Sequence, residues 1–203
     1  MSSPVSDQCA RRGSRRKALS QLANSITGLR FACAPALLWL GWNDYAVGFL
    51  ALLGAAFVSD AVDGFIARKF RLESELGAKL DSTADWVIYS VIPIAAWWLW
   101  PELVRRELFF VALVIVSYTV PVAWGRIKFG VFTSYHTRSV KLAAGLMGFT
   151  VIVFFAGGPV WPFRVAAVMC VIAALEEIAI TAVLSKQKRD IPSLWHALKE
   201  PHR

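Results

Sequence analysis

The chain has 203 residues, of which 57% are hydrophobic, and it carries nine tryptophans and a net charge of +8. This composition excludes an ordinary soluble domain of the same size and predicts an integral membrane protein. The positive charge is spread over several segments beside apolar runs, which favours anionic lipid headgroups or phosphorylated substrates as partners and no nucleic acid.

Residues 1–22 are polar and basic, and they contain no apolar core or cleavage site of a removable signal peptide. We expect a cytosolic tail in this part of the chain. Basic residues stand beside apolar ones from Arg15 to Leu22, which is typical of a short amphipathic helix lying on anionic lipid. A disordered basic tail is the alternative interpretation.

Six apolar runs follow, and each is near the roughly 20 residues that cross a bilayer. They cover residues 26–42, 46–66, 80–100, 108–124, 140–157 and 162–184. The sequence therefore predicts an all-α protein with six transmembrane helices in one domain over residues 23–185. Residues 186–203 are expected to form a second cytosolic tail.

The basic residues predict the orientation of these helices. Nineteen of the 22 lysines and arginines fall on the side that holds both termini, and the other three are Arg105, Arg106 and Arg164. Basic loops favour the cytosolic side of a membrane. Both termini are thus predicted to be cytosolic, and residues 101–107 form a short outer connection.

Four aspartates lie near the cytosolic ends of the second and third predicted helices. Asp60 and Asp63 are three residues apart, and Asp81 and Asp85 are four apart, so each pair shares one face of its helix. Unpaired charge at this depth is costly. Carboxylates without cysteine or histidine favour Mg²⁺ or Mn²⁺, and two ions suit four carboxylates.

Two alternatives to a metal-dependent enzyme stay open from these residues. One is a solvated interfacial cluster in which the aspartates pair with nearby cations: Arg68, Lys69, Arg71 and Lys79. The other is a divalent-cation transporter or channel. A conduction path needs polar residues through the full membrane depth, and the outer halves of the second and third helices are apolar, which disfavours transport.

Eight residues at fixed spacing resemble the signature of the CDP-alcohol phosphatidyltransferases. They read Asp60-xx-Asp63-Gly64-xx-Ala67-Arg68 and, after eight residues, Gly77-xxx-Asp81-xxx-Asp85. The resemblance implies an enzyme that joins an alcohol to the phosphatidyl group of CDP-diacylglycerol and releases CMP. It also implies a homodimer, and we expect a bacterial inner membrane with the active site on the cytosolic face.

The same resemblance implies roles for single positions. Asp60, Asp63 and Asp81 ligate the metal ions, and Asp85 is both near the metals and the general base. The positions that contact CDP-diacylglycerol are Asn24, Thr27, Gly64, Ala67, Arg68, Ser74 and Gly77.

The sequence defines the acceptor alcohol less closely. Residues 125–141 join the fourth and fifth predicted helices and carry candidates for binding the phosphate of glycerol 3-phosphate: Arg126, Lys128, His136, Arg138 and Lys141. Ordinary positive-inside charge is the alternative for each cation. Family members that make phosphatidylglycerophosphate usually show two lysines and a threonine near the start of helix 5, a pattern from which this chain departs. Inositol phosphate, serine or another alcohol therefore stays open beside glycerol 3-phosphate.

Charged residues inside predicted helices are a further anomaly. Glu176 and Glu177 lie in the sixth helix, where a carboxylate either supports the acceptor or an arginine, or is protonated or reaches the interface. Arg30 in the first helix either pairs with an anion or extends to the inner interface.

Overall fold

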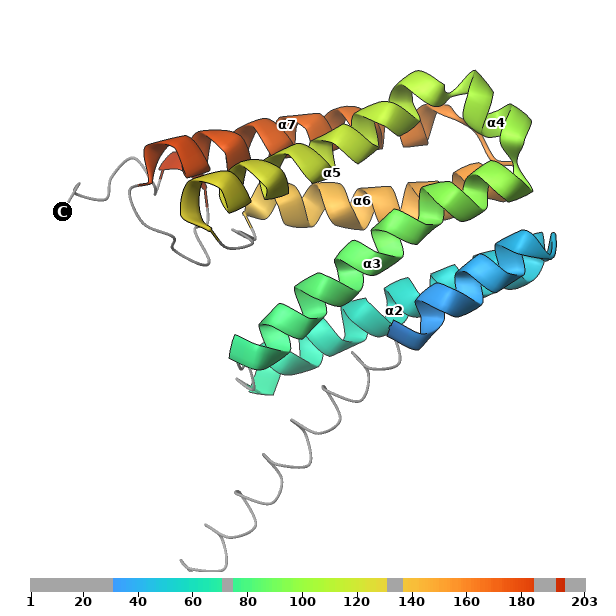
Figure 1. The fold of residues 1–203 in the computed structure, drawn as a ribbon, viewed down its shortest axis with the longest axis horizontal. Helices are drawn as coiled ribbons and strands as arrows, with labels where there is room; N and C mark the ends of the chain where they lie inside the picture. The colour runs from blue at the N-terminus through green and yellow to red at the C-terminus, as the bar shows by residue number, and fades with distance from the viewer. Residues whose placement is uncertain (1–30, 71–74, 131–136, 185–192, 196–203) are drawn as a thin grey trace, which may run out of the picture. The chain divides into compact units, whose positions relative to one another are not determined.

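The structure is a computed structural model, and it describes residues 31–70, 75–130, 137–184 and 193–195. Within these ranges, side chains are described except at residues 60, 63–70 and 75–82. The chain divides into two compact units, Met1–Leu99 and Trp100–Arg203. In the described ranges both units are helical and contain no strand, in agreement with the predicted all-α class (Figure 1).

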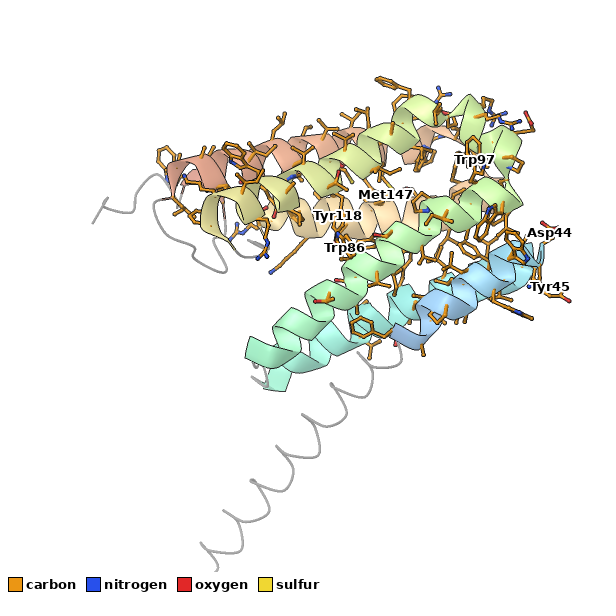
Figure 2. All side chains as sticks on the ribbon, in the orientation of Figure 1. Asp44, Tyr45, Trp86, Trp97, Tyr118 and Met147 are labelled. Atoms are coloured by element: carbon orange, nitrogen blue, oxygen red, sulfur yellow. The ribbon has the colours of Figure 1, made fainter. Side chains whose placement is uncertain are left out.

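The first unit contains a helix over Phe31–Trp42, followed by α2 (Ala46–Phe70) and α3 (Glu75–Leu99). A tight turn joins the first two helices. Asp44 adopts a left-handed φ of 58°, and the amide of Tyr45 donates to the carbonyl of Leu40 at 2.9 Å. Figure 2 shows Asp44 and Tyr45 at this turn.

Small residues allow close packing in the first unit. A Cβ atom built on Gly41 would lie 2.8 Å from the Cβ of Ala95, so glycine is required where the first helix meets α3. One turn further along α3, the rings of Trp42 and Trp98 meet edge to face, with centroids 5.2 Å apart. These contacts hold the two helices together at the end that the charges predict to face outward.

Besides two helical residues at 194–195, the described part of the second unit contains one short helix and three long ones. They are α4 (Pro101–Arg106), α5 (Leu108–Phe129), α6 (Arg138–Phe155) and α7 (Trp161–Val183). The last helix packs against both α5 and α6 (Figure 1). Stacked rings of Phe154 and Phe163, with centroids 4.4 Å apart, fix α6 against α7.

Three described helices are long and apolar enough to cross a membrane, namely α5, α6 and α7. The first unit offers shorter apolar stretches over Phe31–Trp42, Ala46–Ser59 and Thr83–Leu99. The expected start of the first helix, residues 26–30, lies outside the described residues. Apolar helices of membrane length make the chain an integral membrane protein.

Two predicted connections are helical instead. The expected outer loop over residues 101–107 forms α4, because Pro101 suits a first helical position and Glu102 and Arg105 suit the two ends of the helix dipole. The fourth helix, expected to end at residue 124, continues to Phe129. It ends where Gly130 adopts a left-handed φ of 73°.

Candidate active site

The four aspartates all lie on helices, as the sequence predicts. Asp60 and Asp63 belong to α2, and Asp81 and Asp85 belong to α3. Asp60 stands ten positions before the end of α2, and Asp85 stands ten positions after the start of α3. With a rise of 1.5 Å per residue, each lies about 15 Å along its helix from the short connection between them. The two pairs are therefore matched in depth along the backbone.

The buried face of α2 continues toward its aspartates. Phe49, Leu53 and Ala56 are buried and are separated by steps of four and three residues. Further steps of four and three reach positions 60 and 63. Because such steps stay on one face of a helix, the two aspartate positions follow the face that packs inside the unit.

The buried face of α3 leads to its aspartates in the same way. Ala84, Ile88 and Ala95 are buried, and a step of three residues back from Ala84 reaches position 81. Asp85 adjoins Ala84 in sequence, and its side chain is half-buried. The register of both helices thus agrees with a carboxylate cluster inside the first unit.

The described side chains include one of the four predicted metal ligands. Among all described side chains, no three His, Cys, Asp or Glu residues lie together as a metal site. Only Asp85 of the four aspartates has a described side chain. The donor set still fits a hard cation, since every ligand predicted here is a carboxylate on a helix.

The predicted nucleotide contacts fall at the facing ends of α2 and α3. Gly64, Ala67 and Arg68 are in the last turns of α2, and Gly77 is in the first turn of α3. Asn24, Thr27 and Ser74 lie outside the described residues, so these contacts stay predictions.

Two of the residues predicted to bind the acceptor alcohol already donate hydrogen bonds to backbone carbonyls. The Nζ atom of Lys128 donates to the carbonyls of Thr181 and Ala182, each at 2.8 Å, and so caps the end of α7. A guanidinium nitrogen of Arg126 donates to the carbonyl of Gly130, at the end of its own helix. Both residues lie in the last turn of α5 and not in a loop, which corrects the predicted connection over residues 125–141.

Two other candidates are exposed at the start of α6. The side chains of Arg138 and Lys141 make no hydrogen bond or ion pair with the part of the chain that the structure describes. They are three positions apart, so they share a helix face. His136 lies outside the described residues. We call Arg126 and Lys128, which bond backbone carbonyls, the committed pair. We call Arg138 and Lys141, which bond no described residue, the available pair.

A polar cluster lies beside the available pair. Thr137 is fully buried, and its hydroxyl accepts from the amide of Val140 at 3.3 Å as the cap of α6. The hydroxyl of Ser139 donates to Oε2 of Glu176, and the amide of Leu194 donates to Oε1 at 3.0 Å. Glu176 therefore bonds neutral groups of the protein, whereas the sequence left its partner open.

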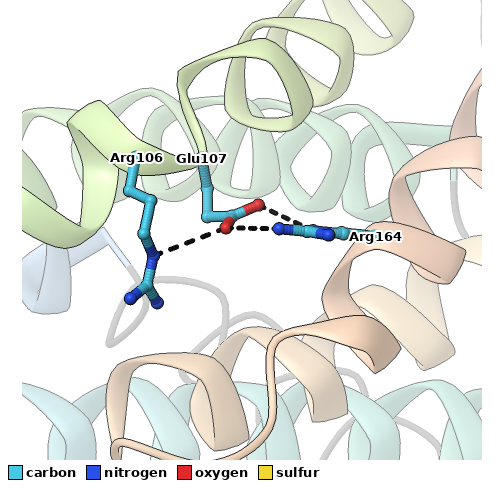
Figure 3. Close-up of polar contacts among 3 residues, drawn as sticks. All are labelled: Arg106, Glu107 and Arg164. Atoms are coloured by element: carbon cyan, nitrogen blue, oxygen red, sulfur yellow. Dashed lines mark hydrogen bonds and ion pairs between the residues drawn. The ribbon is translucent and has the colours of Figure 1, made fainter.

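An ion pair lies at the opposite end of α5 and α7 (Figure 3). Glu107 is only 2% exposed, and its carboxylate accepts two bonds from Arg164, at 2.7 and 2.8 Å. Arg106 lies 3.6 Å from the same carboxylate. The hydrogen bond from Arg164 holds the pKa of the Glu107 carboxyl below its usual range, although burial acts in the opposite direction.

Each of the three basic residues predicted to face outward has a carboxylate partner. Arg106 and Arg164 share Glu107, and Arg105 donates to Glu102 at 2.7 Å. Their positive charge is therefore balanced by nearby carboxylates. At the other end of the unit, Arg138 and Lys141 have no such partner among the described residues. The sequence did not single out Glu107 or Ser139, because their partners stand 57 and 37 positions away.

Comparison with known proteins addresses the identity of this site. The model of the CDP-alcohol phosphatidyltransferase family matches residues 20–182. Two strains of Mycobacterium tuberculosis have a protein named "Probable phosphatidylglycerophosphate synthase" that is 29% identical over an alignment of 194 positions; the alignment covers 87% of this chain and 86% of the relative.

A shorter match comes from Oryza sativa subsp. japonica. Its chloroplastic protein is named CDP-diacylglycerol--glycerol-3-phosphate 3-phosphatidyltransferase 1, and it is 40% identical over 86 residues, which are 41% of this chain and 25% of the relative. No solved structure gives a significant match.

Proposed function

This chain belongs to the CDP-alcohol phosphatidyltransferase family, and we propose that it transfers the phosphatidyl group of CDP-diacylglycerol to glycerol 3-phosphate with release of CMP. The enzyme class rests on the family match over residues 20–182. The proteins of this family act on CDP-diacylglycerol and an alcohol in a membrane. The chain is accordingly a transferase of phospholipid biosynthesis.

Two observations support glycerol 3-phosphate as the acceptor. Relatives that match most of the chain are named phosphatidylglycerophosphate synthases. At the start of α6, Arg138 and Lys141 are exposed, uncommitted to the described residues and on one face. Two adjacent cations near a helix N-terminus suit a phosphate, because the helix dipole adds positive potential there. These features outweigh the departure from the usual lysine pattern.

The aspartates would supply the metal site of the reaction. Asp60, Asp63, Asp81 and Asp85 would hold two Mg²⁺ or Mn²⁺ ions, which neutralise pyrophosphate charge when bound. In the proposed reaction, the acceptor hydroxyl oxygen forms a bond to the phosphorus of the phosphatidyl group. The bond from that phosphorus to the oxygen of CMP breaks, and Asp85 takes the hydroxyl proton. In this proposal, Arg68 would bind phosphate oxygens of the donor.

The proposed membrane arrangement has six spans, cytosolic termini and a homodimer. The spans and the orientation are supported by the three long apolar helices of the second unit and by the paired charges at its outer end. The homodimer is proposed from the family resemblance alone. The site would then lie at the cytosolic face, where the headgroup of a lipid-linked nucleotide meets a soluble alcohol. A bacterial inner membrane is the proposed location.

A single assay tests this function. Purified protein is incubated with CDP-diacylglycerol, Mn²⁺ or Mg²⁺ and a panel of alcohols, and both CMP and the lipid product are measured. We expect metal-dependent CMP release with glycerol 3-phosphate and none with inositol phosphate or serine. Turnover only with another alcohol would refute the acceptor, and metal flux into sealed vesicles without CMP release would favour transport.

Replacement of the proposed base tests the mechanism. Asp85→Asn should stop turnover while the protein still binds CDP-diacylglycerol, because the amide cannot accept the hydroxyl proton at neutral pH. Full activity of this variant would remove Asp85 from the role of base.

A further inference from the structure

The carboxylate of Glu176 joins three segments of the second unit. One oxygen accepts from the hydroxyl of Ser139 in the first turn of α6, and the other accepts from the backbone amide of Leu194 at 3.0 Å. The side chain of Leu194 also packs against the buried Ile180 and Leu184 of α7 and its end. We call Thr137, Ser139, Glu176 and the Leu194 amide the Glu176 cluster.

The start of α6 is anchored on one side and open on the other. Thr137 is fully buried and lies 2.9 Å from Ser139, hydroxyl to hydroxyl. Ser139 is half-buried toward α7, whereas Arg138 and Lys141 are exposed. The first turn of α6 thus presents two cations outward while its inner side is bound to Glu176.

Direct contact between Glu176 and the acceptor is disfavoured. Both of its oxygens already accept hydrogen bonds from the protein. A carboxylate facing a phosphorylated alcohol would also repel it. A role that acts through Ser139 requires neither a free oxygen nor contact with an anion.

We propose that Glu176 is a positioning residue for the acceptor: through Ser139 it fixes the first turn of α6, and with it Arg138 and Lys141. This inference rests on the proposed function. Long cationic side chains bind a phosphate best when the backbone that carries them is already fixed, because less freedom is lost on binding. The Leu194 amide adds the C-terminal segment to the same anchor.

Steady-state kinetics separates this role from a purely structural one. In Ser139→Ala and in Glu176→Ala, KM for glycerol 3-phosphate should rise about tenfold, as expected for losing one hydrogen bond to a charged group. KM for CDP-diacylglycerol should stay within about twofold, since the donor site is on α2 and α3. Glu176→Gln should recover part of the loss, because its amide oxygen still accepts one bond.

The double variant tests whether the two residues act as one unit. Ser139→Ala with Glu176→Ala should raise the acceptor KM no further than the larger single effect, because both remove the same contact. Equal changes in both KM values, or additive effects of the two replacements, would overturn the positioning role. If Glu176→Ala does not fold, Ser139→Ala and Glu176→Gln still decide the question.

Hydrogen exchange provides a readout that is independent of activity. The amide of Leu194 should exchange faster in Glu176→Ala than in the wild type, because its acceptor is lost. Thr119→Ala is the matched control for the KM measurement: it removes an exposed hydroxyl that donates to Ile115 within its own helix, so the acceptor KM should not change. Unchanged exchange at Leu194 in Glu176→Ala would refute the anchor, whereas absence of CMP release by the wild type would refute only the proposed function.

Discussion

Replacement of single cations at the end of α5 and the start of α6 tests where the acceptor phosphate binds. Glutamine at Arg138 or Lys141 removes a positive charge that bonds no described residue. It preserves helix propensity and most of the side-chain stem. Glutamine at Arg126 or Lys128 removes the same charge from side chains in the last turn of α5, which already cap helix ends. The two pairs are therefore matched in charge but differ in availability.

The size of the effect follows from exposure and bonding. A hydrogen bond to a charged group contributes about 1.5–3 kcal/mol, and the exposure of Arg138 and Lys141 favours the lower end of that range. With about 1.36 kcal/mol per factor of ten, each replacement should raise KM for glycerol 3-phosphate about tenfold. If the two contacts act independently, the double variant should lose about a hundredfold.

The committed pair should behave differently. The ammonium of Lys128 donates to two carbonyls that end α7, so its loss should lower thermal stability and leave the acceptor KM within about twofold. Arg126→Gln should resemble it, since its guanidinium caps α5.

The assay is CMP release at saturating CDP-diacylglycerol, with glycerol 3-phosphate varied at constant ionic strength, beside a thermal melt of each variant. Equal increases in KM for both pairs would mean that only the general positive charge of this face attracts the acceptor. An unchanged KM in both Arg138→Gln and Lys141→Gln would refute the proposed phosphate site.

Four further predictions concern stability and metal dependence. Glu107→Gln should lower the melting temperature, because it removes the buried charge that pairs with Arg164. Because Arg164 lowers the pKa of Glu107, the wild-type ion pair contributes its full stability above the unfolded carboxyl pKa of about 4.3. This stability is lost as the pH falls through the folded pKa. If the melting temperature of the wild type falls no more than that of Glu107→Gln as the solution is acidified below the unfolded pKa, the prediction is wrong. Gly41→Val should destabilise the first unit, since its Cβ would meet Ala95 at 2.8 Å; Gly145→Val, where a Cβ meets no described atom within 4 Å, is the control in the melt. A chelator should abolish CMP release, with recovery on adding Mn²⁺ but not Na⁺, and activity that survives chelation would exclude the four-aspartate metal site.

The helices were predictable because their signals are local. Apolar runs of membrane length indicate α5, α6 and α7, and the observed bounds differ from the predicted ones by a few residues. The main error in a helix bound is at the end of α5, where the sequence prediction ended the helix too early. Residues 125–129 are polar enough to suggest a loop, yet the helix continues until Gly130 adopts a left-handed conformation.

The spacing of the aspartates was equally informative. Steps of three and four residues place a pair on one helix face whatever the tertiary structure, and the buried faces of α2 and α3 continue in the same register. The family resemblance was carried by eight positions within 26 residues, and the family match over residues 20–182 confirmed it.

What the sequence determined by itself is the all-α class, the family and the placement of the four aspartates on helices, because all three depend on residues near one another in the chain. Only the tertiary structure decided which charged groups are committed. Lys128 finds its carbonyls 53 positions away, Arg164 finds Glu107 at 57, and Glu176 finds Ser139 at 37. Such pairings depend on which helix ends the fold brings together, and of the four cations only Arg138 and Lys141 bond no described residue.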